Sequence, residues 1–383
     1  MPTRRPALCS LIAPLAAVLV LGLALAGCGA KDAGGPPPLD PAALRAVAEK
    51  PGVARERLAR EIDALFADET AGETRALVIM RGGRIVAERY GEGFTKDTPL
   101  IGWSMAKTVT GVMIGMLVSD GRLRMDETAP VPAWQRSGDP RGEITVRQLL
   151  QMRSGLRHVE GGDPVYESDE VRMLFLDGRD NMAAYAEAQP LEAEPGRRFE
   201  YSSATSVILA DIAARALTDL TDPAARRRAV ADYLHNRFFV PAGMTSMVPE
   251  FDAAGTFVGS SMLYGTARDW AKLGEFLRNS GSVKGAQLVP RGWIDFMRRP
   301  SPRNPAYGAQ LWLNRPSSTG KDALFPGKAP ANVFGAVGHL GQYVIVSPDQ
   351  KVTLVRLGHS TDKERAAARA RLARIIALFP EWK

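Results

Sequence analysis

Two side chains at the start of one apolar segment have the types and spacing for acyl-transfer chemistry. Ser104 is followed three positions later by Lys107, the only charged residue between positions 102 and 118. On a helix this spacing places both side chains on one face, with Cβ atoms about 5–6 Å apart. A neutral lysine at that distance could accept the serine proton and activate the hydroxyl as a nucleophile.

The lysine must lose its charge for this chemistry, and the surrounding sequence favours that loss. A free lysine has a pKa of about 10.4, so neutralising it at pH 7 costs roughly 4–5 kcal/mol. Residues 105–118 predict a helix that is apolar on every side, which is typical of a buried helix, and burial disfavours the charged form. Gly111 and Gly115 would let other elements approach this helix closely.

A simpler interpretation of Ser104 is available, because serine is common as a helix cap. The Ser-x-x-Lys pattern also occurs three times, as Ser104/Lys107, Ser318/Lys321 and Ser360/Lys363. Ser318 lies in a loop with no helix after it, and Ser360 precedes an arginine-rich helix with a wet face. Only Ser104 precedes a helix that must be buried, which favours chemistry there.

Two distant stretches could supply partners for this pair. Tyr201, in "GRRFEYSSATSV", lies where an extended run meets a new helix, so its hydroxyl could point into a cleft. Its alternative role is to cover an edge of the core. His339 and Gly341, in "VGHLGQYVIV", flank Leu340 at the start of a strand. Glycine there would let a substrate lie against the strand edge, although a simple bend would also explain it.

Together, "SMAK", "YSS" and "HLG" have the order and rough spacing of motifs in the serine β-lactamase and penicillin-binding-protein superfamily. The chain resembles the class C-like branch, and within it the 6-aminohexanoate-dimer (nylon-oligomer) hydrolases and the family VIII esterases. Stretches such as "ITVRQLLQMRSGL" and "TARDWAKLGEFLRNSG" extend this resemblance over about residues 77–378.

The resemblance implies a role for each matching residue. Ser104 would be the acylated nucleophile, Lys107 its proton partner and Tyr201 the residue that passes a proton to the leaving group. His339 and Gly341 would lie on the strand along the substrate. The oxyanion hole would consist of the backbone N–H groups of Ser104 and Gln342. Trp103 and Ser203 are expected beside these groups.

Two departures from the family pattern bear on the substrate. Ser203 stands where asparagine is usual after Tyr-x, and neither Tyr-x-Asn nor Lys-Thr-Gly occurs in the chain. Both motifs help such enzymes hold penicillins and peptides. We therefore expect a serine hydrolase that cleaves a carboxylic ester or amide of a small-molecule or peptide-like acyl substrate. β-Lactamase or D-Ala-D-Ala carboxypeptidase activity is the alternative, and a non-catalytic envelope binding protein is the rival of another class.

The N-terminus predicts export and a lipid anchor. Arg4 and Arg5 precede an uncharged run, residues 11–26, which ends in the lipobox-like sequence Leu25-Ala26-Gly27-Cys28. This resemblance implies a lipoprotein signal peptide over residues 1–27, lipidation of Cys28 and a flexible tether over residues 28–39. The protein would then be anchored at the periplasmic face of the inner or outer membrane. An uncleaved transmembrane anchor is the alternative, since about 20 apolar residues can span a bilayer.

Composition excludes several other classes of function. The cysteines, Cys9 and Cys28, both lie in the leader, so we expect neither disulfide nor thiol chemistry in the body. The four histidines are far apart and form no HExxH pattern, so no metal or other cofactor is expected. The net charge of +7 is explained by solvated helix faces. Nucleic acid is not an expected partner, and weak attraction to anionic lipid is the alternative. The oligomeric state cannot be predicted.

The elements that must position these residues predict an α+β fold. Residues 76–89 alternate as a hairpin around Gly82-Gly83, and strands are expected again near residues 307–313, 334–340, 342–347 and 351–357. Helices are expected at residues 53–67 and 362–378, and most of residues 126–299 is helical in pattern. We expect one domain, residues 40–383, with strand-rich parts at about 70–100 and 305–383. One antiparallel sheet would be flanked by N- and C-terminal helices, with a large, mostly helical insert at about 101–300.

Overall fold

A six-stranded antiparallel sheet joins strands from both ends of the domain. In the computed structural model, which describes residues 38–383, the strand order is β2-β1-β11-β10-β9-β8. The strands are β1 (Glu73–Arg81), β2 (Arg84–Tyr90), β8 (Trp312–Leu313), β9 (Phe334–Gly338), β10 (Gln342–Ser347) and β11 (Val352–His359). The expectation that the early hairpin and the late strands share one sheet is confirmed. β1 pairs directly with β11, with Val78 opposite Val355.

The β1–β2 hairpin turns where the sequence predicts it. Arg81 pairs with Arg84 across Gly82 and Gly83, whose φ angles are 56° and 82°. A two-residue hairpin turn of this kind needs positive φ at both positions, which glycine adopts at little cost. The strand expected at residues 307–313 is much shorter, because only Trp312 and Leu313 pair with β9. Gln310, with φ of 60°, interrupts the extended run.

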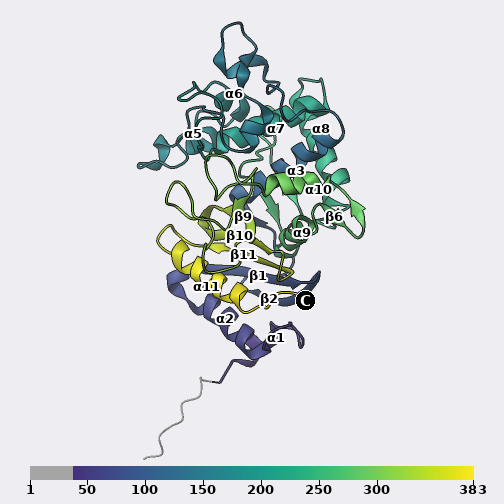
Figure 1. Cartoon of the computed structure of the whole chain (residues 1–383), viewed down its shortest axis with the longest axis vertical. Coiled ribbons are helices and arrows are strands. Elements are labelled where there is room, and N and C mark those ends of the chain that lie inside the picture. The colour runs from purple at the N-terminus through teal and green to yellow at the C-terminus, as the bar shows by residue number, and fades with distance from the viewer. Residues whose placement is uncertain (1–37) are drawn as a thin grey trace, which may run out of the picture. The chain divides into compact units, whose positions relative to one another are not determined.

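The two faces of the sheet carry separate layers of helices (Figure 1). Leu77 and Ile79 point into a core shared with α1 (Pro41–Arg45), α2 (Arg55–Ala67) and α11 (Arg365–Ala377). The alternate side chains Ala76 and Val78 point into a second core, shared with α3 (Ala106–Ser119) and α9 (Ala267–Arg278). This alternation places helices from both ends of the domain on one face and the insert on the other, as expected.

The insert is built mainly of short helices around α3 and α7. Its other elements are α4 (Val146–Leu150), α5 (Asp169–Phe175), α6 (Met182–Glu187), α7 (Ser203–Leu217), α8 (Pro223–Leu234), α10 (Arg291–Met297), a small sheet of β3 (Leu100–Ile101), β5 (Leu263–Gly265) and β4 (Val248–Pro249), and the hairpin β6 (Ser282–Val283) with β7 (Ala286–Gln287). Residues 39–383 form one compact unit.

The predicted signal peptide and Cys28 lie outside the described residues. Within residues 38–383, none of the helices has the length and apolar character needed to cross a membrane.

Helix α3 is buried along almost its whole length, and two glycines make room for its neighbours. Every residue from Ala106 to Leu117 is buried. A Cβ atom on Gly111 would lie 2.9 Å from Gln310 Cβ, and one on Gly115 would lie 2.2 Å from Trp293 Nε1. The Trp293 indole donates a hydrogen bond of 3.0 Å to the Gly111 carbonyl. The close approach expected at both glycines is therefore observed.

We predict that Gly115→Ala lowers the free energy of unfolding by about 1–3 kcal/mol, because the new methyl group overlaps the Trp293 ring. Gly292→Ala is the matched control on the neighbouring helix α10, because a Cβ there meets no atom within 4 Å. It should leave stability equal or slightly higher, since alanine favours a helix. Urea unfolding of both variants measures the difference, and equal stability of the two would contradict this packing.

Candidate active site

Ser104 lies in a short 3-10 turn, Trp103–Met105, directly before α3. Neither this turn nor α3 has a side-chain cap hydrogen bond. The Ser104 hydroxyl instead lies 3.1 Å from Lys107 Nζ. Trp103 has φ of 48°, a left-handed conformation that bends the backbone sharply at this point. The cap interpretation is therefore wrong, and the serine and lysine face each other as the spacing predicts.

Lys107 is 1% exposed and is held by three oxygen atoms. Besides Ser104 Oγ, its Nζ contacts Ser203 Oγ at 2.9 Å and the Ser260 carbonyl at 3.0 Å. Burial lowers the pKa of Lys107, while the nearby Glu160 and Glu170 oppose this shift. These contacts suit a neutral amine, which can donate to Ser203 and Ser260 and accept the Ser104 proton. They suit the ammonium form equally after that proton has been transferred.

Tyr201 completes the group around the serine. Lys107 Nζ lies over the face of the Tyr201 ring, 4.9 Å from the ring centroid. It is held by the rings of Tyr307 and Trp312, at 5.8 and 5.2 Å between centroids. Burial, followed by the charge of Glu160, raises the pKa of Tyr201 well above 10, and a hydrogen bond with Ser104 acts in the opposite direction. Tyr201 is therefore a neutral phenol at pH 7.

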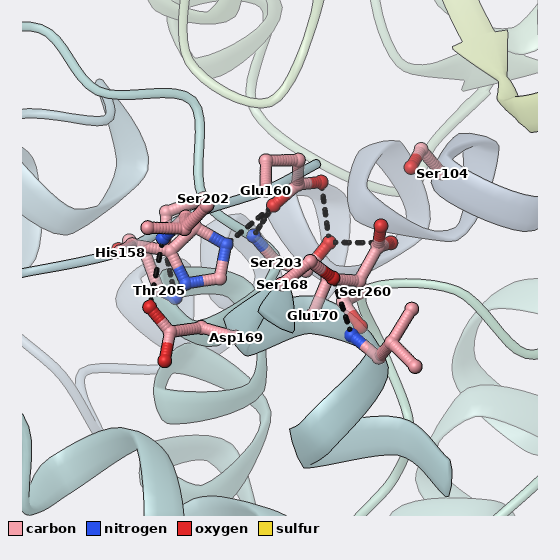
Figure 2. Close-up of polar contacts among 12 residues, drawn as sticks. Ser104, His158, Glu160, Ser168, Asp169, Glu170, Ser202, Ser203, Thr205 and Ser260 are labelled. Carbon is pink, nitrogen blue, oxygen red and sulfur yellow. Dashed lines mark hydrogen bonds and ion pairs between the residues drawn. The ribbon is translucent and has the colours of Figure 1, made fainter. Parts of the chain in front are cut away.

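Ser203 makes a direct contact with Lys107, and two glutamates that the sequence analysis assigned no role lie beside it (Figure 2). Glu160 accepts hydrogen bonds of 2.7 Å from both the backbone N–H and the hydroxyl of Ser203. Its carboxylate also lies 2.6 Å from His158 Nε2 and 3.9 Å from Lys107 Nζ. Glu170 Oε1 lies 3.1 Å from the Ser203 hydroxyl.

A backbone clamp explains how two glutamates ten positions apart come together. The Val159 N–H donates to the Asp169 carboxylate at 2.8 Å, and the Asp169 N–H donates to the Val159 carbonyl at 2.8 Å. The Tyr185 hydroxyl holds the same carboxylate at 2.9 Å. This clamp closes the loop and brings Glu160 and Glu170, the next residue after each clamped position, toward Ser203. No spacing or composition in the sequence marks such a contact.

Hydrogen-bond counting at Ser203 assigns different charges to the two glutamates. A hydroxyl has one proton to donate and two lone pairs. Ser203 accepts from Lys107, and its single proton lies between the carboxylates of Glu160 and Glu170, at 2.7 and 3.1 Å. When this proton is given to Glu160, the contact with Glu170 is satisfied if Glu170 is protonated and donates. Burial and then the charge of Glu160 raise the pKa of Glu170 to about 7. Burial also acts to raise the pKa of Glu160, but Lys107 and His158 outweigh it and lower this pKa to about 2.

The assignment of the substrate-edge strand needs correction. His339 and Gly341 lie in the turn His339–Gly341 after β9, and not on the edge strand. Leu340, with φ of 57°, and Gly341, with φ of 81°, turn the chain there. Gln342 begins β10, between β9 and β11, and is 3% exposed, so its backbone lies inside the sheet. The N–H group expected in an oxyanion hole is therefore not that of Gln342.

The end of β9 is the part of the sheet that reaches the serine. A Cβ atom on Gly338 would lie 2.1 Å from the Gly102 carbonyl, so the two backbones are in close contact. The next residue, His339, packs its ring edge-on against Trp103, with 5.6 Å between centroids. Gly338 thus contacts the backbone two positions before Ser104, and His339 contacts the residue directly before it.

Comparisons with known proteins find similar sequences and folds. A beta-lactamase family model matches residues 60–378. A 6-aminohexanoate-dimer hydrolase of Paenarthrobacter ureafaciens is 28% identical over 233 residues, which cover 58% of this chain and little more than half, 56%, of that protein. A family VIII carboxylesterase structure gives a TM-score of 0.62 at 17% identity, covering 85% of this chain and 98% of its own. The octameric penicillin-binding protein homologue of Pyrococcus abyssi gives 0.60 at 19% identity, covering 84% and 77%.

We predict that Glu170 makes folding stability depend on pH. Its raised pKa contributes stability that is fully present below its ordinary value of 4.5 and is lost as pH rises through about 7. The side chain of Glu170→Gln cannot ionise, so this variant does not lose that stability. The free energy of unfolding of the variant minus that of the parent protein should therefore be about 1–3 kcal/mol larger at pH 8 than at pH 5. Urea unfolding at both pH values measures this change.

Glu167→Gln is the matched control, because Glu167 lies on the same loop and is exposed. Its stability difference from the parent protein should be the same at both pH values. A Glu170→Gln variant with an equally flat difference would show that Glu170 is already ionised in the folded protein.

Proposed function

The chain belongs to the beta-lactamase family and is a serine hydrolase, and from this premise we propose that it cleaves carboxylic esters or unstrained amides through an acyl-enzyme on Ser104. The resemblance to this superfamily that the sequence predicted is thereby confirmed. The observation that carries the proposal is the set of contacts around Lys107, in which Ser104 Oγ lies 3.1 Å from a fully buried amine. Burial lowers the pKa of Lys107 and thereby favours the neutral amine that can act as a base.

Lys107 is the proposed base for acylation. Tyr201 has its pKa raised well above 10, so very little phenolate exists at pH 7, whereas the pKa of Lys107 is lowered. Lys107 takes the Ser104 proton while Oγ attacks the carbonyl carbon. Tyr201 gives its proton to the departing alkoxide or amine, and the proton on Lys107 then restores the phenol. Water releases the acid from Ser104 in the second half of the reaction, with the same groups moving its proton.

The proposed oxyanion hole consists of the backbone N–H groups of Ser104 and His339. His339 follows Gly338, which lies against the Gly102 carbonyl, and its ring packs on Trp103. Two N–H groups at this point would stabilise the negative charge that develops on the carbonyl oxygen. His339 replaces Gln342 in this role.

The surroundings of Ser104 favour simple acyl substrates over β-lactams. Ser203 occupies the usual asparagine position, and its hydroxyl is fully engaged by Lys107, Glu160 and Glu170. The residues before Gly338 are Ala336 and Val337, so this strand end offers no lysine for a substrate carboxylate. The names of two similar proteins, an amino-acid-oligomer hydrolase and a carboxylesterase, support short amides and esters.

We also propose that the protein is exported and anchored by a lipid on Cys28, on the strength of the sequence Leu25-Ala26-Gly27-Cys28. We predict that intact mass of the protein from native membranes corresponds to a chain that begins at a diacylated Cys28. Cys28→Ala should be misprocessed or released. A mass that matches an unmodified Cys28 in native membranes would refute the anchor.

The substrate preference gives a direct prediction. The kcat/KM for p-nitrophenyl acetate or butyrate should exceed that for nitrocefin by at least about tenfold, a difference of about 1.4 kcal/mol in transition-state binding. Short amides of amino-acid oligomers are tested in the same panel. Equal or faster turnover of nitrocefin would favour the β-lactamase alternative.

The proton-transfer scheme predicts how variants behave. Ser104→Ala, Lys107→Met and Tyr201→Phe should each lower kcat for p-nitrophenyl butyrate by about 1,000-fold or more, and double variants should be little worse, because the three groups act as one unit. Fluorophosphonate labelling followed by intact mass reports the nucleophile separately, and Ser104→Ala should abolish it.

Lys321→Met is the matched control for Lys107→Met, because Lys321 belongs to the same Ser-x-x-Lys pattern in an exposed loop. It should retain full activity. Circular dichroism establishes that each variant is folded, and a folded Ser104→Ala variant that still hydrolyses esters would exclude this site.

A further inference from the structure

Arg356, on β11, is a buried guanidinium whose hydrogen bonds all go to neutral acceptors. It is 0% exposed. It donates to the carbonyls of Gly341 at 2.7 Å, Glu73 at 2.8 Å and Ala71 at 3.5 Å, and to the Thr74 hydroxyl at 3.3 Å. Burial lowers its pKa to about 10. A buried charge without a hydrogen-bonded carboxylate is costly, so its position calls for an explanation.

Two glycines shape the space that this guanidinium fills. A Cβ atom on Gly341 would lie 2.6 Å from Arg356 Nη1, and one on Gly358 would lie 2.8 Å from Arg356 Cζ. Gly341 also has φ of 81°, which other residues rarely adopt. At Gly358 the Glu73 carbonyl would lie closer still, 2.1 Å from such a Cβ, so the backbone as well as the arginine restricts this position to glycine.

The turn His339–Gly341 is held at each of its three carbonyls. The Gln342 side-chain amide donates one N–H to the Gly358 carbonyl at 2.6 Å and shares the other between the carbonyls of His339 and Leu340, at 3.2 Å each. The Ser360 N–H donates to the Leu340 carbonyl at 2.8 Å, and Arg356 holds the Gly341 carbonyl. Leu340 is in the left-handed region with φ of 57°. A strained conformation of this kind persists only where surrounding contacts fix it.

The fixed turn begins with His339, which contacts Trp103, the residue directly before Ser104. Gly338 and Gly102 are in backbone contact, and His339 packs on Trp103. Stabilising an oxyanion requires an N–H group held within about 0.5 Å of its productive position. A turn that is free to relax would move this group and would leave the Ser104–Lys107 pair unchanged.

We propose that Arg356 is a positioning residue that fixes the turn His339–Gly341 and thereby keeps the His339 N–H aimed at the substrate carbonyl. This role rests on the proposed acyl-enzyme function. Arg356 acts from the opposite side of the turn, through the Gly341 carbonyl, and does not touch substrate. This role explains why a buried charge, which is costly, lies against the Gly341 carbonyl of this turn.

The test compares Arg356→Met with Arg356→Lys. For p-nitrophenyl butyrate, Arg356→Met should lower kcat by about 10–100-fold with KM changed less than about threefold, because an oxyanion contact acts mainly in the transition state. Phenylboronic acid forms a tetrahedral adduct on serine, and its inhibition constant should increase in parallel. Arg356→Lys should recover part of both losses. A folded Arg356→Met variant with parental kcat and boronate inhibition overturns the proposal.

Two further variants keep the test decisive. Gln342→Leu removes the shared N–H contact with the His339 and Leu340 carbonyls of the same turn, so it should give the same split between kcat and KM even if Arg356→Met does not fold. Arg298→Met is the matched control: Arg298 is half-buried and stacks at 4.6 Å on Phe334, at the other end of β9. It should leave kcat unchanged. Loss of kcat in all three variants would indicate general loosening of the sheet and would overturn the proposal.

Hydrogen exchange separates this proposal from the proposed function. In Arg356→Met, amide exchange should speed up in the peptide covering residues 334–345 and stay unchanged in the peptide covering residues 104–118. This outcome requires no catalytic activity. If the parental protein neither hydrolyses esters nor labels with a fluorophosphonate, the acyl-enzyme function fails, while the exchange data still decide whether Arg356 fixes the turn. Unchanged exchange at residues 334–345 overturns it.

Discussion

The buried amine of Lys107 is the constraint on which the rest of the structure depends. An amine inside a protein needs oxygen partners, and each partner comes from a different part of the chain: Ser104 from its own turn, Ser203 from the start of α7 and the Ser260 carbonyl from the loop before β5. Burying it requires α3 to be apolar on every side. Glycines in α3 then let Trp293 and Gln310 close over the helix.

Glu160 and Glu170 affect the pKa of that amine through their own charges. Two ionised carboxylates would favour the ammonium form of Lys107 and would oppose its action as a base. The raised pKa of Glu170, about 7, limits this, because much of Glu170 then stays protonated at neutral pH beside an ionised Glu160, and the single proton of the Ser203 hydroxyl suits such a pair. One serine hydroxyl therefore couples the charge of the lysine to that of two carboxylates. An asparagine at this position would offer a different set of donors and acceptors.

Local patterns predicted most of the fold and the centre of the site. The Gly82-Gly83 turn, the apolar helix after Ser104 and the Ser-x-x-Lys spacing each depend on neighbouring residues, so they are visible in the sequence. No role could be assigned to the side chains of Glu160 and Glu170, because their clamp depends on contacts across the fold. Residues 339–341 were assigned to a strand and form a turn instead. The left-handed backbone of Leu340 and Gly341 distinguishes this turn from a strand.

The pairing of β1 with β11 has a consequence for when the protein can act. This pair joins strands about 280 positions apart, Val78 opposite Val355, and such distant contacts form late in folding. Until β9, β10 and β11 have assembled on β1, Lys107 is hydrated and charged and no strand end faces Ser104. The nucleophile is therefore latent in an unfolded chain and becomes reactive only once the sheet is complete.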